Sequence, residues 1–400
     1  MMPAEVAPAN LESQGRSSAL WARARTITEA ERFTRTLGQE HALSVAEESR
    51  VSLREANKHS SLNYDNEAWL AVVRPAIQGA TSRFVLIPWV VVTVIALVIE
   101  GFELLGAPER LPSTVPVAFG GLMSLLLAFR LNSSFGRWQE ARTLWGVLIV
   151  TSRALMLHLT AAAAHGGLQP ISGGQRRDGR IDDEQPECPA AAAAWTLGFA
   201  TALKLHLRKS PMPPTRSDDR NGDLPPGLHR LLSVRQLREL AEASHPPMYA
   251  LRELRLALEE GLHDIKRPAF EAKCLDCVEA LVGALTGCER ILRTPCPPGY
   301  VGLLRGVCVV WMLMLPFALV EVLGWIMVPV VSLTSLLVLA IEQLAVQIEN
   351  PFGEDANDLP LDAFCLTVET ELIQALAESS SAQPFRDFEA EQRASPSRSV

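Results

Sequence analysis

The sequence predicts an all-α membrane protein with four spanning helices and a further helical region in water. Its apolar residues gather in a few long runs of the 400-residue chain. Runs of about 20 apolar residues are long enough to cross a bilayer. Between the runs, apolar residues recur at the three- and four-residue spacing of amphipathic helices. The average composition, 48% hydrophobic and 20% charged, matches an ordinary soluble protein, so the prediction depends on this clustering.

Two apolar runs in the first half of the chain predict the first two spans. Residues 84–105, FVLIPWVVVTVIALVIEGFELL, carry no charge before Glu100. The turn GAPERLPST follows, and the second span is expected at about 115–131. This run continues unbroken into RLNSSFGRWQEARTLWG, which predicts one helix that passes from bilayer into water. The arginines of its polar half indicate the cytosolic or an equivalent side.

The third and fourth spans are expected at about 301–322 and 326–347. LGW at 323–325 divides this stretch and predicts a tight helical hairpin. Four crossings place both termini on the same side of the membrane as the region between residues 130 and 300.

The remaining segments differ in character. Residues 1–64 are polar, and their Arg- and Ser-containing part indicates either a weak organelle-targeting segment or a mobile tail. Residues 165–189 and 209–227 are rich in Gly, Pro and charge, so we expect disordered insertions there. The Ala-rich stretch 190–208 is expected to be a packed helix outside the membrane, and 377–400 a disordered tail.

Several classes of function find no support in the sequence. A net charge of −8 argues against a nucleic-acid partner. No HExxH, GxSxG, Walker or GxGxxG motif occurs, so we expect no enzyme activity. Cys274 and Cys277 form a CxxC without a second pair at zinc spacing, and they are expected to be structural thiols.

Two long motifs carry a resemblance to a known family. LLLAFRLNSSFGRWQEARTLWG (125–146) closes the second span, and IENPFGEDANDLPLD (348–362) closes the fourth. Together with ERILRTPCPPGY (289–300), they resemble the bestrophin family of anion channels, chiefly its bacterial and plant branch, while NPFGED also resembles the animal branch. The resemblance covers residues 65–376, which we expect to form the channel domain, interrupted by the two insertions.

The resemblance implies a homopentamer in the lipid bilayer around one central pore. Chloride, and bicarbonate or other monovalent anions, would pass through it passively. Ca²⁺, voltage or volume would regulate it, and no cofactor other than Ca²⁺ is implied. The resemblance fits several locations: the plasma membrane, the chloroplast or thylakoid membrane, and the membranes of other organelles. The alternative is a non-conducting membrane scaffold that binds partners through its cytosolic helices.

The second span is expected to line the narrow neck of the pore. Gly121, Leu125 and Phe129 share one helix face and match the neck-lining positions of the family. Gly121 departs from the bulky apolar residue usual there, which predicts a wider outer neck. If the register slips, Ala118, Leu122 and Leu126 form the alternative stripe. An uncharged neck suits gating by dewetting.

The arginines that follow the neck have two interpretations. Arg130 is expected to line the cytosolic vestibule and attract anions. Alternatively these arginines are buried in ion pairs with Glu140 or other acids, which we favour for Arg137 and Arg142 because tryptophans alternate with them.

The acidic loop after the fourth span is a candidate Ca²⁺ site. Calcium prefers several oxygen ligands. By resemblance, Asp355 and Asp358 would supply side-chain oxygens, and Gln347 and Asn350 carbonyl oxygens. The loop lacks the EF-hand pattern. The alternative is a helix-terminating loop in which Asp362 caps the next helix.

Overall fold

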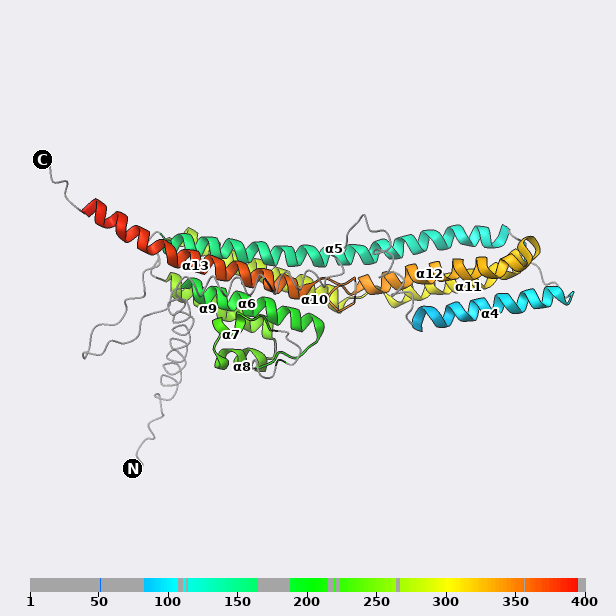
Figure 1. Cartoon of the computed structure of the whole chain (residues 1–400), viewed down its shortest axis with the longest axis horizontal. Coiled ribbons are helices and arrows are strands. Elements are labelled where there is room, and N and C mark those ends of the chain that lie inside the picture. Colours follow the sequence, from blue (N-terminus) through cyan, green and yellow to red (C-terminus); the bar gives the residue numbers. More distant parts are fainter. Residues whose placement is uncertain are drawn as a thin grey trace, which may run out of the picture. The chain divides into compact units, whose positions relative to one another are not determined.

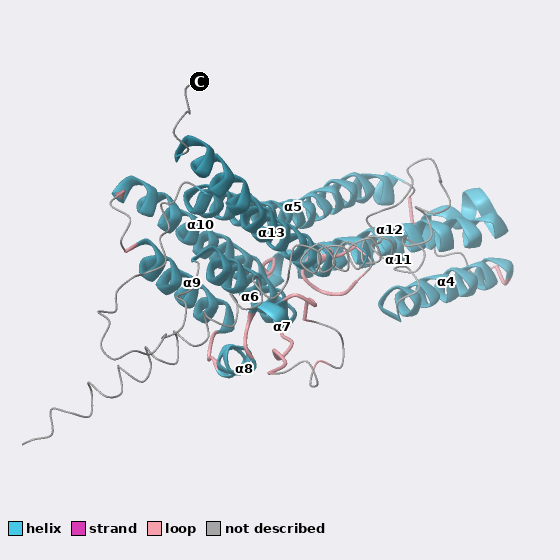
Figure 2. Cartoon of the chain, turned by 60° about the vertical axis from the view of Figure 1, so that its left-hand side comes forward, coloured by secondary structure: helices cyan, strands magenta, loops and turns pink. Residues whose placement is uncertain are grey.

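The computed structural model describes residues 51, 83–106, 111–112, 114–164, 188–214, 219, 224–263, 267–355 and 357–394. These residues form helices and loops, and no strand occurs among them (Figure 2). They divide into two compact units. The span unit comprises residues 59–143 and 287–360, and the bundle unit comprises residues 1–58, 144–286 and 361–400. Except for residue 51, the predicted polar segment 1–64 lies outside the described residues.

The span unit contains the four helices predicted to cross the membrane. Within the described residues, three stretches are long and apolar enough to do so: Phe84–Leu104, Thr114–Ala163 and Pro298–Glu349. The third stretch holds two helices in succession. The helices are α4 (Arg83–Leu104), α5 (Thr114–Ala164), α11 (Pro298–Leu323) and α12 (Met327–Glu349). The predicted spans therefore fall on four helices, and α5 continues into the bundle unit as the unbroken helix that the sequence predicts.

A short 3₁₀ turn, η2 (Gly324–Ile326), joins α11 to α12 at the predicted hairpin. Gly324 has φ +49°, in the left-handed region that side chains with a Cβ disfavour. Its backbone N–H donates to Val320 O and closes α11. The hairpin thus depends on a glycine where the sequence reads LGW.

The apolar faces of these helices form one core. α4 packs on α11 and α12 (Figure 1). The indole N–H of Trp89 donates to the carbonyl oxygen of Ser332 over 3.0 Å, which ties α4 to α12. The core residues are Val92, Ala96, Met123, Leu127, Leu304, Cys308, Met312, Leu315, Val320, Met327, Val328, Val331 and Val338.

The bundle unit is built around α6 (Cys188–Arg208), which contacts α7, α9 and α13. Nearly every residue of α6 is buried because its alanines allow neighbouring helices to approach closely. α6 is not among the candidate spans found in the described residues, and its burial agrees with the predicted packed helix. The other helices are α7 (Leu228–Leu231), α8 (Val234–Glu242), α9 (Pro246–Leu262), α10 (Pro268–Arg293) and α13 (Leu361–Ala394), of which α10 extends into the span unit.

Parts of the segments predicted to be disordered are ordered. Residues 165–187 lie outside the described residues, but residues 188 and 189 begin α6. In the insertion at 209–227, Met212 and Leu224 are buried in the core. A packed apolar side chain fixes the backbone that carries it, so these two positions are ordered. α13 continues to Ala394, beyond residue 377, where the sequence predicted the tail to begin. Alanine and glutamate, which favour helices, recur in that stretch.

An ion-pair cluster joins the start of α13 to α6. Asp362 accepts a hydrogen bond from Lys204 Nζ over 2.8 Å and lies 2.8 Å from Arg208 Nη2. The side chain of Lys204 is only 2% exposed, whereas that of Asp362 is 48% exposed. Burial would raise the pKa of Asp362, but the two cations outweigh it and hold this pKa below the ordinary value of 3.8. Asp362 therefore acts by ion pairing inside the first turn of α13, rather than as the N-cap that the sequence suggested.

We expect Asp362→Asn to destabilise the protein at neutral pH. The free energy of unfolding should fall by about 1 kcal/mol, since the carboxylate is partly screened by solvent, and Tm by roughly 2–4 °C. The pKa of Asp362 is lowered in the folded state. Its contribution to stability is therefore fully present at pH values above the ordinary pKa of 3.8, and it is lost as the pH falls through the folded-state pKa. Thermal unfolding of both proteins from pH 7 to pH 3 should give a Tm difference that shrinks on acidification. A difference independent of pH would contradict this, and Glu259→Gln, in the exposed pair with Arg255, is the control.

Candidate functional site

The predicted neck residues lie on an exposed face of α5. Gly121, Leu125 and Phe129 are all exposed, with 53% exposure for Leu125 and 56% for Phe129. No charged side chain is part of this stripe. In the alternative stripe, Ala118 and Leu122 are exposed, but Leu126 is half-buried and packs against the core. The exposure of all three members therefore favours the Gly121 register as an available apolar surface.

Two neighbouring glycines on α5 have opposite surroundings. A Cβ at Gly120 would lie 3.0 Å from Trp311 Nε1, so this position holds α5 close to α11. The same indole N–H donates to Pro116 O over 2.9 Å. A Cβ at Gly121 would meet nothing within 4 Å. Packing within the chain requires a small residue at Gly120, while Gly121 leaves space on the exposed face.

Arg130 does not lie where the sequence predicted. Its side chain is 1% exposed, and its Nη2 donates to Glu349 Oε2 over 2.6 Å. Its Nε also lies 3.7 Å from Glu342 Oε2. A buried, paired guanidinium offers no open positive surface, so this position does not support the vestibule role expected for Arg130. Helical geometry explains the difference, since Arg130 is seven residues after Met123 and three after Leu127, both in the core.

Arg137 is structural, as favoured from the sequence, but its partners are carbonyl groups. Its guanidinium donates to Ile291 O and Thr294 O, each over 2.6 Å, and to Glu349 O over 3.1 Å. These carbonyls lie at the C-terminal ends of α10 and α12. Such carbonyls have no partner within their own helix and carry the negative end of the helix dipole. One arginine therefore closes two helices and joins them to α5.

The two sequence motifs meet in the span unit. Trp138 Nε1 donates to Asn357 O over 3.0 Å. Glu140, considered as a partner for Arg137 or Arg142, instead pairs with Arg290. Glu349 accepts hydrogen bonds from Arg130, from Arg137 and from the backbone N–H of Cys296, the last over 2.8 Å. Glu349 is the residue that the sequence reasoning missed, although it belongs to the quoted motif IENPFGED.

The loop after α12 is closed by its own carboxylate. Asp358 is buried, and its Oδ2 accepts from the Asp355 N–H over 2.7 Å. A Cβ at Gly353 would lie 2.6 Å from that oxygen, so the loop requires glycine there. Asn357 Nδ2 donates to Gln347 Oε1 over 2.9 Å, which connects the loop back to α12.

The chemistry of the loop fits a Ca²⁺ ion only in part. Asp355 and Asn350 are exposed and offer oxygens, as calcium requires. One oxygen of Asp358 and the side-chain oxygen of Gln347 already accept hydrogen bonds. If Ca²⁺ binds, Asp355 and the second oxygen of Asp358 would hold it together with backbone carbonyls of Gln347 and Asn350. The ion would supply positive charge to the loop.

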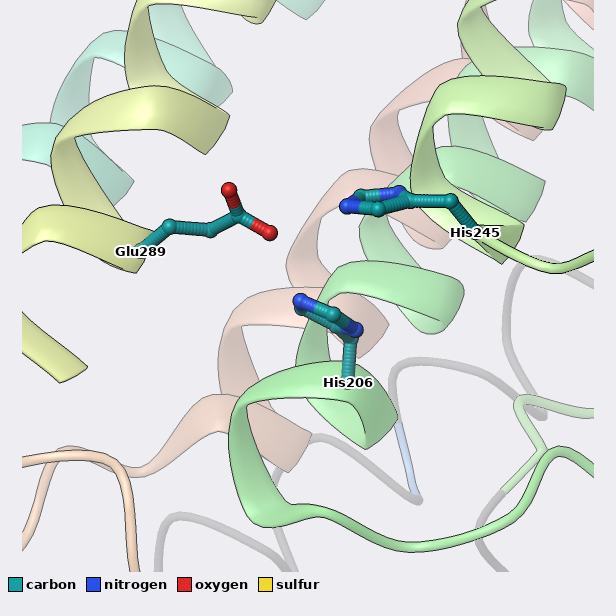
Figure 3. A group of neighbouring side chains, drawn as sticks. All are labelled: His206, His245 and Glu289. Carbon is teal, nitrogen blue, oxygen red and sulfur yellow. The ribbon is translucent and has the colours of Figure 1, made fainter. Parts of the chain in front are cut away.

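The bundle unit also carries thiols and imidazoles, the remaining types of reactive side chain. Burial raises the pKa of Cys274 to about 12 and also raises that of Cys277, which agrees with structural thiols. His206 of α6 and His245, the N-cap residue of α9, bring their rings to 4.7 Å between centroids (Figure 3). His245 Nδ1 accepts a hydrogen bond from the Met248 N–H over 3.3 Å.

Comparison with known proteins assigns the family. Residues 62–374 match the family described as Bacterial/Fungal Bestrophin protein. The chain therefore belongs to the bestrophin family and is a multi-pass integral membrane protein, as the motifs indicated.

Relatives and solved structures agree with this assignment. The chain is 32% identical to a voltage-dependent anion channel-forming protein of Nostoc sp., over 62% of this chain and 72% of that protein. It is 25% identical to the chloroplastic voltage-dependent chloride channel 1 of Arabidopsis thaliana, over 78% and 72% of the two chains. A crystal structure of a bacterial bestrophin homologue from Klebsiella pneumoniae matches with a TM-score of 0.59 at 25% identity, covering 73% of this chain and 98% of that one.

We expect Arg137→Lys to destabilise the span unit although it keeps the charge. An ammonium group cannot reproduce the planar fork that reaches three carbonyls. Losing one or two hydrogen bonds from a charged donor should lower the free energy of unfolding by roughly 3 kcal/mol. Thermal unfolding in detergent measures this, with Arg290→Lys, an exposed ion-pair residue, as the matched control. Equal unfolding temperatures for the two variants would contradict the role of Arg137.

Proposed function

We propose that this protein is an anion-selective channel whose pore is formed by five copies of the chain. It passes chloride, and also bicarbonate, passively down their gradients. The proposal includes no catalytic step. The observation that carries it is the exposed, uncharged stripe Gly121–Leu125–Phe129 on α5. The names of the relatives, anion channel-forming proteins and a chloride channel, support the same function.

The stripe suits the neck of a shared pore. Exposed Leu125 and Phe129 leave apolar area uncovered in a single chain, and copies arranged around an axis would direct this area to one hole. A narrow apolar constriction can close by losing its water. The absence of a carboxylate on the stripe leaves no fixed negative charge to repel an anion there.

Purified protein reconstituted in vesicles tests the proposal. A chloride gradient should drive flux that a gradient of an impermeant anion does not, and bicarbonate should replace chloride. Vesicles that stay sealed to both anions would point to the non-conducting scaffold instead. Cross-linking should give particles of five chains.

Substitutions at the adjacent residues Gly120 and Gly121 distinguish an effect on the pore neck from an effect on helix packing in the same flux experiment. Gly121→Leu should fold normally, because nothing within 4 Å of its Cβ opposes it, and should lower chloride flux by narrowing the outer neck. Gly120→Leu should instead lower stability, because its side chain would collide with Trp311. Unchanged flux in a well-folded Gly121→Leu variant would place the neck elsewhere.

We further propose that the loop after α12 binds Ca²⁺ and that binding regulates the flux. Asp355 is the residue to test, because its side chain is exposed whereas Asp358 holds the loop together. Asp355→Ala should weaken Ca²⁺ binding at least about tenfold, as expected for the loss of a carboxylate ligand, and should remove any Ca²⁺ response of the flux. Glu354→Ala, at the exposed neighbouring position, should change neither. Calorimetric titration with Ca²⁺ and flux with and without the ion give the two readouts, and a Ca²⁺ response retained in Asp355→Ala would rule out this site.

A further inference from the structure

A chain of alternating charges runs behind the exposed stripe of α5. Arg305 on α11 donates from Nε to Glu342 Oε1 on α12 over 2.9 Å. The other oxygen of Glu342 faces Arg130 on α5 at 3.7 Å, and Arg130 continues to Glu349 at 2.6 Å. Two arginines and two glutamates balance in charge and connect three helices. Charged groups within membrane-spanning helices are costly and commonly have a function.

The link between Glu342 and Arg130 is the weak one in this chain. At 3.7 Å it is an ion pair without a hydrogen bond. Glu342 Oε2 and Arg130 Nε and Nη1 are buried, and none has a hydrogen-bond partner among the described residues. In contrast, both carboxylate oxygens of Glu349 accept hydrogen bonds, Oε2 from Arg130 and Oε1 from the Cys296 N–H. A buried donor and acceptor left unpaired at this distance favour a small movement that would join them.

Such a movement would reach the stripe directly. Arg130 immediately follows Phe129 in the same helix, so a movement that shifts the backbone at Arg130 also displaces the aromatic ring. The Arg305 side chain, by comparison, is 54% exposed and pairs with Glu342. Glu342 of α12 therefore links Arg305 of α11 to Arg130, the residue that follows the stripe on α5.

We infer that Glu342 is a positioning residue for the pore: through Arg130 it holds Phe129 in the arrangement that conducts. This inference rests on the proposed function. It assigns to Glu342 a role in flux that is separate from folding, because the folded connection of α5 to α12 is already made through Glu349 and Arg137.

Glu342→Gln keeps the size of the side chain and removes its charge. We expect chloride flux per assembled particle to fall about tenfold, within the range typical of coupling between two sites, and the current–voltage curve to change shape. Arg305→Gln leaves the Glu342–Arg130 link in place and should stay within about twofold of the unaltered protein.

The double variant Arg305→Gln/Glu342→Gln distinguishes positioning from local charge. It restores charge balance but lacks the link to Arg130, so its flux should remain as low as that of Glu342→Gln. Recovery in the double variant, or flux within twofold in Glu342→Gln, would overturn the inference. An effect confined to yield and Tm, with normal flux per particle, would also overturn it by indicating a structural role alone.

If Glu342→Gln does not assemble, Glu342→Asp keeps the charge and withdraws the carboxylate by one methylene. A partial loss of flux is expected, and unaltered flux would overturn the inference. Absence of chloride flux in the unaltered protein would instead overturn the proposed function, so the two failures are distinguishable.

Discussion

The span unit depends on how two arginines of α5 satisfy the C-terminal end of α12. Arg130 binds the carboxylate of Glu349, and Arg137, two turns later, binds its backbone carbonyl. Helix ends leave carbonyls without partners, and in an apolar setting an unpaired carbonyl is expensive. Arg137 meets this requirement for α10 as well. The same contacts bring the second and fourth spans together. They also place the loop with Asp355 and Asp358 beside Trp138, the residue after Arg137.

This constraint fixes the rotation of α5 about its axis. Because Gly120, Arg130 and Arg137 must face the other helices of the unit, the opposite face carries Gly121, Leu125 and Phe129. The polar anchors and the apolar stripe are thus two consequences of one helical periodicity. The side of the helix with more charge is buried and the apolar side is exposed, which is the reverse of a soluble helix and is reasonable where the surroundings are lipid or other copies.

Much of this organisation could be predicted from the sequence, and the reasons are local. Long apolar runs, the LGW turn and the unbroken pattern across residue 131 depend on neighbouring residues, so the spans, hairpin and long helix were all predicted. The position of Arg130 depends on partners more than 200 residues away, Glu342 and Glu349, and sequence reasoning had no means of choosing between an exposed and a buried arginine. The same holds for Asp362, whose cations lie on α6. The order at Met212 and Leu224 was missed because Gly, Pro and charge around them masked two single core residues.

The contacts between α5 and α12 are strong at one level of the span unit and weak at the next. Contacts at Glu349 and Arg137 are short and numerous, so they resist relative movement of α5 and α12 at that level. Two turns earlier on α12, Glu342 reaches Arg130 only at 3.7 Å, and the helices there are joined chiefly by apolar packing, which is less directional than hydrogen bonding. A helix held firmly at one level and loosely at the next can bend at that boundary. The boundary falls at Phe129 and Arg130, at the C-terminal end of the exposed stripe.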